Sequence, residues 1–190
     1  MTIDTLIVAF APGARGFTFG RWLLNNKIAH AYKNTSSEFK EVNHTFVPWY
    51  NDVLFCFDND TRDTYLKINK LLLDDNSDFN QLLELISTTK HMPLKNQTIP
   101  GLVLTHHATS QGLKKLKKAL NGTVIRITFL DAEQATQSMH RKMQLDNITT
   151  FNQSTYQTDY IPFLEDFDFA TNVKLDQVNL LDLDFLKELK

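Results

Sequence analysis

A continuous apolar run close to the N-terminus, Thr5 to Ala11, limits the fold of this chain more than any other feature of its sequence. A strand with one face in water alternates apolar and polar residues, so an unbroken run of this length predicts a strand buried on both faces. The run stops at Pro12 and Gly13, and the proline-free segment 17–32 that follows has apolar residues at helical spacing. The sequence therefore predicts a central parallel strand, a glycine turn and a helix, in that order.

The rest of the chain continues this alternation of strands and helices. Helices are predicted at 61–73, 78–88, 110–120 and 131–145, strands at 99–105, 123–129 and 173–180, and a short helix at 182–189. Parallel strands need crossover connections, so this order predicts an α/β fold, a three-layer parallel sheet with helices on both faces. The 190 residues are predicted to form a single α/β domain, 1–190, in which the aromatic segment 34–60 is a candidate insertion.

Charge and cysteine content exclude several function classes. The 20 Lys and Arg residues against 22 Asp and Glu give a net charge of −2, which argues against binding to nucleic acid by bulk electrostatics but leaves a local phosphate pocket open. The single cysteine, Cys56, excludes a disulfide framework and a cysteine-rich zinc site. Asp4 stands where a signal peptide has a basic residue, and no apolar run approaches the roughly 20 residues that span a bilayer. We therefore expect a cytoplasmic protein with no membrane partner, and the high Asn, Lys, Phe and Thr content is compatible with an AT-rich microbial or viral source.

The glycine turn after the first strand is the strongest candidate for a functional site. In the segment Gly13 to Thr18, glycines let the backbone direct its amide hydrogens toward one point, and the start of the following helix adds partial positive charge. Arg15 and Thr18 can donate directly to an anion. This combination predicts a phosphate-binding turn, although a glycine turn that only connects a strand to a helix has the same pattern. It is not a Walker A loop, because the pattern GxxxxGK[ST] is absent.

Two segments at the ends of predicted strands resemble the sulfotransferase-like branch of the P-loop family. Arg15 to Thr18 is similar to the family's nucleotide-binding loop, which has Lys or Arg, two small residues and then Thr at a helix start; Phe17 stands where the family has glycine. The predicted strand 102–106 ends in Thr-His, as does the family strand whose histidine is the general base. The resemblance implies a P-loop NTPase/sulfotransferase-like fold.

Two further segments match this family more weakly. The strand 124–129 leads into a helix with Ser138, where the family has an arginine at the strand end and a helical serine that hold the 3′-phosphate; Phe129 occupies the place of that arginine. The segment 177–183 looks like the late strand and short helix near the end of the family's core. The matching segments occur in the family's order along most of the chain.

The resemblance implies transfer of a sulfuryl group from 3′-phosphoadenosine 5′-phosphosulfate, a small-molecule nucleotide donor, to an unknown acceptor, without a metal ion. Arg15 is implied as the group that stabilises the negative charge growing on the bridging phosphate oxygen during in-line displacement. His106 is implied as the general base, a role that suits a neutral imidazole, while His107 is expected on the opposite side of the strand. The residues implied for cofactor binding are Gly13, Ala14, Arg15, Gly16, Phe17, Thr18 and Ser138.

Two other interpretations stay open. The chain could be a non-catalytic interaction or particle-associated protein that retains the P-loop fold, or an atypical nucleotide or small-molecule kinase. Other charged residues are expected on solvated helix faces: Lys114, Lys115, Lys117, Lys118, His140, Arg141 and Lys142.

Overall fold

The computed structural model describes residues 5–10, 16–29, 62–88, 99–106, 108–145 and 165–175 of the chain. Its strands are β1 (Thr5–Phe10), β2 (Gly101–His106), β3 (Gly122–Phe129) and β4 (Thr171–Leu175). Its helices are α1 (Gly16–Asn25), α3 (Arg62–Leu73), α4 (Phe79–Thr88), α5 (Ser110–Ala119) and α6 (Ala132–Leu145). Each of these elements overlaps one that the sequence predicts.

The described strands form one parallel sheet in the order β2-β1-β3-β4. β1 lies between β2 and β3, and all of its residues are buried, as its continuous apolar run predicts. In the register of the sheet, Phe10 at the end of β1 is level with His106 of β2 and with Ile127 of β3. The prediction of an α/β fold built on a parallel sheet is confirmed, and the carboxyl ends of these strands lie at one edge.

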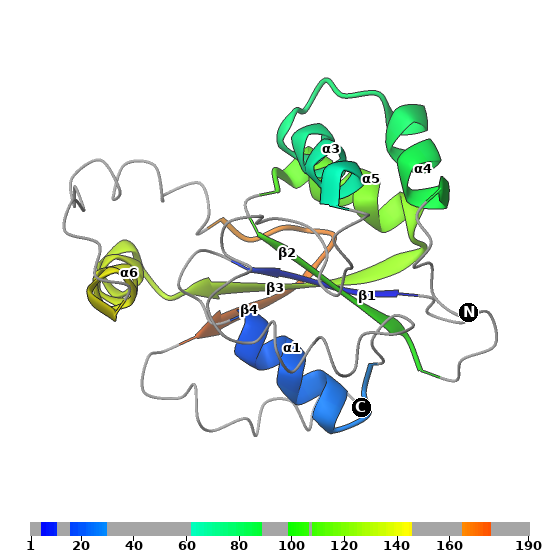
Figure 1. Cartoon of the computed structure of the whole chain (residues 1–190). Helices are drawn as coiled ribbons and strands as arrows, with labels where there is room; N and C mark the ends of the chain where they lie inside the picture. The colour runs from blue at the N-terminus through cyan, green and yellow to red at the C-terminus, as the bar shows by residue number, and fades with distance from the viewer. Residues whose placement is uncertain are drawn as a thin grey trace.

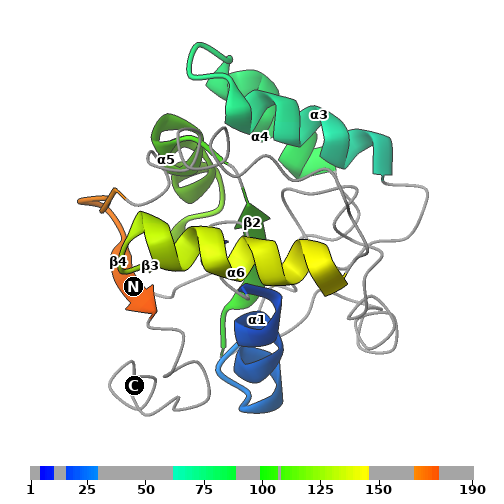
Figure 2. The same ribbon diagram turned by 90° about the vertical axis from the view of Figure 1, so that its left-hand side faces the viewer.

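Helices lie on both faces of this sheet. Figure 1 shows α1 on one side and α3, α4 and α5 on the other, and Figure 2 shows the same separation after a quarter turn. Ile7 and Val103 pack into one core cluster with Leu113 of α5, whereas Leu104 contacts α1, where a Cβ on Gly20 would lie 2.9 Å from its Cδ1 atom. Successive side chains of a strand point to opposite faces, so these contacts place α1 and α5 on opposite sides.

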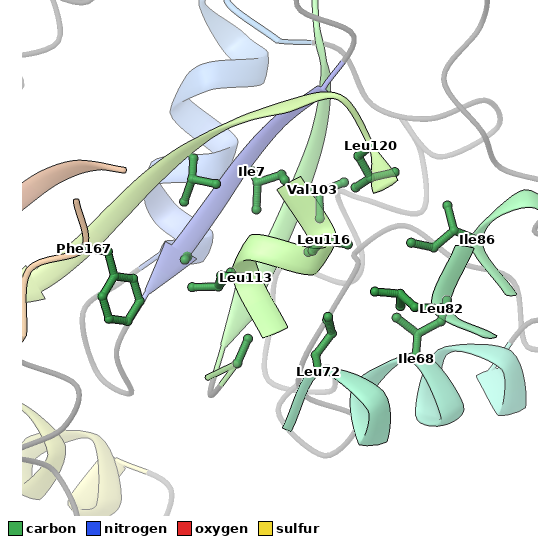
Figure 3. Packing of buried hydrophobic residues seen from close by; sticks show 13 residues of the cluster. Ile7, Ile68, Leu72, Leu82, Ile86, Val103, Leu113, Leu116, Leu120 and Phe167 are labelled. Atoms are coloured by element: carbon green, nitrogen blue, oxygen red, sulfur yellow. The ribbon is translucent and has the colours of Figure 1, made fainter. Parts of the chain in front are cut away.

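The larger part of the core lies between the sheet and the α3–α4–α5 layer. Leu113 and Leu116 of α5 lie between Ile7 and Val103 of the sheet and Leu72 of α3, as Figure 3 shows, and all of them are almost fully buried. Burying one such side chain contributes about 1.5–3 kcal/mol to folding. α5 is therefore the central helix of this layer, and its position follows from contacts on two sides.

The predicted helix 17–32 ends earlier than the sequence indicates. α1 stops at Asn25, and Lys27 takes a left-handed backbone conformation with φ of 56°. The amide of Ile28 then donates to the carbonyl of Leu23 (2.9 Å), and that of Lys27 to the carbonyl of Leu24 (3.1 Å). These two bonds form a Schellman motif, which closes the last turn of a helix. The prediction was wrong here because the apolar spacing continues through Ile28 and no glycine marks the stop.

Other predicted boundaries agree more closely. Asp78 accepts from the amide of Asn80 and Asp131 accepts from that of Gln134, so these aspartates are N-caps at the predicted starts of the two helices. β4 begins at Thr171, earlier than the predicted 173. The candidate insertion at 34–60, the continuation of the last strand to 180 and the helix at 182–189 lie outside the described residues.

Candidate functional site

The carboxyl ends of β1 and β3 form the place in this sheet where a ligand site is expected. In the strand order β2-β1-β3-β4, the connection from β1 runs to β2, and the connection from β3 runs in the opposite direction to β4. Adjacent parallel strands whose connections run in opposite directions leave a crevice beyond their ends, and ligands of open α/β sheets bind in such crevices. The start of α1, which follows β1, is at this end of the sheet, and His106 is the last residue of β2, the neighbour of β1 on its other side.

The structure places the predicted site residues unequally. Gly16, Phe17 and Thr18 are the first residues of α1, and His106 is level with Phe10 across the sheet. Ser138 is half-buried in α6, on a different helix. The predictions for Gly13, Ala14 and Arg15, and those for the side chains of Phe17, Thr18 and His106, lie outside the described residues.

The start of α1 is in close contact with the end of β1. A Cβ atom built on Gly16 would lie 2.0 Å from Cγ of the Phe10 ring, so only glycine allows the helix to begin this near the ring. The first turn of α1 holds no acidic residue, which leaves the positive end of the helix dipole uncompensated by a side chain there. The close packing of Phe10 on Gly16 could not be expected from the sequence, since the two residues meet only when the turn folds back.

The helix that follows β3, the neighbour of β1, differs from α1 in the charge of its first turn. Phe129, the last residue of β3, is fully buried. Asp131 follows, and its Oδ1 atom accepts a hydrogen bond of 2.8 Å from the amide of Gln134 in the first turn of α6. Glu133 adds a second carboxylate to the same turn. The start of α6 is therefore occupied by acidic groups, in contrast to the start of α1.

Arg126 is a buried cation within β3. Its Nε atom donates to the carbonyl of Glu165 (2.9 Å), and its guanidinium carbon lies 3.7 Å from the centre of the Phe167 ring. Asn172 holds the same turn, with its side chain bonded in both directions to the backbone of Phe167. Arg126 thus fastens the turn before β4 to β3, which explains why an arginine is tolerated at 5% exposure.

The predicted exposed lysines of α5 contact other parts of the protein. Lys114 and Lys117 both lie near the Phe169 ring, at 5.1 and 5.9 Å from its centre, and Lys117 also donates to the carbonyl of Phe169. Lys118 lies 4.6 Å from the centre of the Phe79 ring in α4. These contacts give the lysines a packing role, and their presence needs no external anion to explain it.

Lys115 has the largest set of contacts among these lysines. Its Nζ atom donates to the backbone oxygens of Asp75 (2.9 Å) and Ser77 (2.7 Å), to Oγ of Ser77 (2.9 Å) and, at 3.4 Å, to the carbonyl of Asp74. These atoms form the turn between α3 and α4. The ammonium group therefore fixes that turn against α5.

The described residues limit what else the site contains. Among the described residues, no group of three or more His, Cys, Asp or Glu side chains is placed to hold a metal ion. None of the described helices has an apolar stretch long enough to cross a membrane. What remains near the end of β1 is a helix start without acidic groups, which Arg15 precedes in the sequence, and His106 at the end of the neighbouring strand β2. No family model matches the chain, and no curated protein matches it.

Proposed function

We propose that the protein binds the 5′-phosphate end of a nucleotide at residues 13–18 and transfers an activated sulfuryl group from that nucleotide to a hydroxyl or amine acceptor. One observation carries the proposal. The glycine turn that the sequence singled out follows β1, and the connections from β1 and from its neighbour β3 run in opposite directions along the sheet, to β2 and to β4. Open α/β sheets bind ligands beyond the carboxyl ends of strands at such a switch point.

The start of α1 favours an anion. Helix starts attract phosphate through backbone amides and the helix dipole, and no carboxylate in the first turn of α1 opposes this attraction. Arg15 directly precedes the helix and adds a full positive charge. A phosphate bound to residues 14–18 would lie beyond the end of β1.

Arg15 and His106 are residue types that match the needs of sulfuryl transfer. As a bond forms between sulfur and the acceptor oxygen or nitrogen, the bond from sulfur to the bridging phosphate oxygen breaks, and charge grows on that oxygen. Arg15 donates hydrogen bonds to this oxygen, and His106 accepts the proton that the acceptor loses. 3′-Phosphoadenosine 5′-phosphosulfate is the donor that the family resemblance implies.

Nucleotide binding is tested by titrating the full chain with adenosine 5′-monophosphate and measuring the melting temperature. We expect the melting temperature to rise, because a ligand that binds only the folded state stabilises it. Arg15→Ala should weaken binding about tenfold or more, the effect of losing one charge-assisted contact. Lys27→Ala, which removes a cation at the opposite end of α1, should leave binding unchanged. If the nucleotide gives the parent protein no shift, the proposal is wrong.

Transfer is tested separately with a sulfate-labelled nucleotide donor and a panel of hydroxyl and amine acceptors. His106→Ala should lower the transfer rate about a hundredfold or more while nucleotide binding persists, because general-base catalysis contributes about 10²–10⁴ to a rate.

One observation favours a second candidate, a non-catalytic interaction protein with the same fold. The Phe10 ring packs against Gly16, so an aromatic side chain covers part of the start of α1. If this ring blocks access of a phosphate, nucleotide produces no shift and Arg15→Ala changes nothing. The titration above therefore separates the two functions.

A further inference from the structure

The segment 165–175, which consists of a turn and the strand β4, lies against β3 and α5 at the edge of the described sheet. β4 pairs in parallel with β3. The Nε atom of Arg126 in β3 donates to the carbonyl of Glu165 (2.9 Å), and its guanidinium lies over the Phe167 ring. Phe167 belongs to the core cluster, and Phe169 packs against that cluster. Two phenylalanines therefore anchor this edge segment to the protein.

Two lysines of α5 complete the surface on which the segment lies. Lys117 donates to the carbonyl of Phe169 (2.9 Å) and lies 5.9 Å from the centre of its ring. Lys114 lies 5.1 Å from the same ring centre, and its Nζ atom is 3.9 Å from Oδ1 of Asp168. We call Arg126, Lys114 and Lys117 the receiving surface. The turn that it holds has three carboxylates, those of Glu165, Asp166 and Asp168. The two sides are thus complementary in charge.

Contacts within the segment give the turn before β4 its shape. The side chain of Asn172 accepts from the amide of Phe167 (3.0 Å) and donates to the carbonyl of the same residue (2.8 Å). The amide of Ala170 also donates to that carbonyl (3.1 Å), and the rings of Phe167 and Phe169 stack with their centres 5.4 Å apart. A segment that is ordered by its own contacts loses less conformational freedom when it binds. The segment 165–175 is therefore suited to bind as a unit.

The contacts between the segment and the receiving surface are of kinds that another copy of the segment can make equally well. The side chains of Lys114 and Asp168 are both exposed, and exposed ion pairs contribute little to stability. Pairing of a strand with a sheet edge uses main-chain hydrogen bonds, which do not depend on the chain that supplies the strand. Identical edge elements are exchanged between copies in this way.

We infer that the receiving surface recognises an acidic strand with two phenylalanines, and that the segment 165–175 of a second copy of this chain occupies it when the chain's own segment is released. The aromatic rings and the strand backbone supply the contacts, and the three carboxylates fit the positive charge of the surface. α5 and α1 lie on opposite sides of the sheet, so this exchange takes place away from the start of α1.

Recognition is tested with a fluorescently labelled synthetic peptide of residues 165–175, titrated into the full chain and into its Phe167→Ala variant while the anisotropy is measured. The variant loosens the chain's own segment and keeps the receiving surface. We expect it to bind the peptide about tenfold or more tightly than the parent, in which the surface is already occupied. A peptide with alanine in place of both phenylalanines should not bind. If Phe167→Ala does not fold, Asn172→Ala, which loosens the turn without removing a core side chain, takes its place.

Phe79→Ala is the matched control, because Phe79 of α4 also lies under a lysine of α5, Lys118, but outside the segment 165–175. Its affinity for the peptide should equal that of the parent. An equal affinity of Phe167→Ala and the parent for the peptide overturns the proposed recognition.

Exchange between copies is tested by mixing two full-length variants and measuring the molar mass by light scattering after size-exclusion chromatography. Phe167→Ala has an intact receiving surface, and Lys117→Glu has an intact segment but a receiving surface with one charge reversed. We expect the mixture to contain a heterodimer that neither variant forms alone. A mixture that stays monomeric overturns the exchange between copies.

Discussion

Gly16 and Phe10 show how single residues determine the geometry of the crevice. The Phe10 ring occupies the space that any side chain at position 16 would need, and this contact sets where α1 starts relative to β1. Asp131 has an equally local effect at the end of β3, because its carboxylate makes the start of α6 acidic. Two helix starts at one end of the sheet thus differ in charge through a few side chains.

Gly16→Ala should destabilise the protein by about 1–3 kcal/mol, since the new methyl group would overlap the Phe10 ring and force it to move. Urea unfolding of the parent and the variant measures this change. The same substitution in a Phe10→Leu background is the control, because the smaller side chain relieves the overlap. Equal effects of Gly16→Ala in both backgrounds would show that the contact with the ring is not the cause.

Helix α5 connects the sheet to α3 and α4 through both apolar and charged side chains. Leu113 and Leu116 face the sheet and α3, while Lys115 binds the turn between α3 and α4. The close approach of α3 and α5 also requires Gly112, where a Cβ would lie 2.0 Å from the carbonyl oxygen of Leu72. The positions of α3 and α4 on the sheet therefore depend on α5.

Lys115→Met should lower the free energy of unfolding by about 1–2 kcal/mol. The methionine keeps the apolar stem but removes the donors to Asp75 and Ser77, whose oxygens lose a charged partner. Chemical denaturation measures the loss. Lys70→Met, at an exposed position on α3, is the control and should change stability by less than about 0.5 kcal/mol. A loss no larger than that of the control would mean that the turn does not depend on Lys115.

Local signals in the sequence were sufficient for the elements but not for all of their ends. The buried run that begins at Thr5 and the helix starts near positions 78 and 131 are predicted from neighbouring residues, and the structure confirms them. The end of α1 was missed because a Schellman motif with Lys27 in the left-handed region has no glycine to mark it. The partners of Lys115 were missed because they lie about 40 residues away in the chain.

The strand order β2-β1-β3-β4 determines where the candidate site lies on the sheet. This order depends on contacts between distant segments, so the sequence predicted a parallel sheet but not which strands are neighbours. Once β1 lies between β2 and β3, the start of α1, His106 and Asp131 follow strand ends at the same end of the sheet. The functional roles of Arg15 and His106 remain predictions from residue chemistry and from the family resemblance.

The most direct test of the central claim, that residues 13–18 bind the phosphate of a nucleotide, is a crystal structure of the full chain grown with adenosine 5′-monophosphate. We predict that the phosphate lies against the backbone amides of residues 14–18 at the start of α1. A phosphate bound elsewhere, or an aromatic side chain filling this position at saturating nucleotide, would contradict the claim.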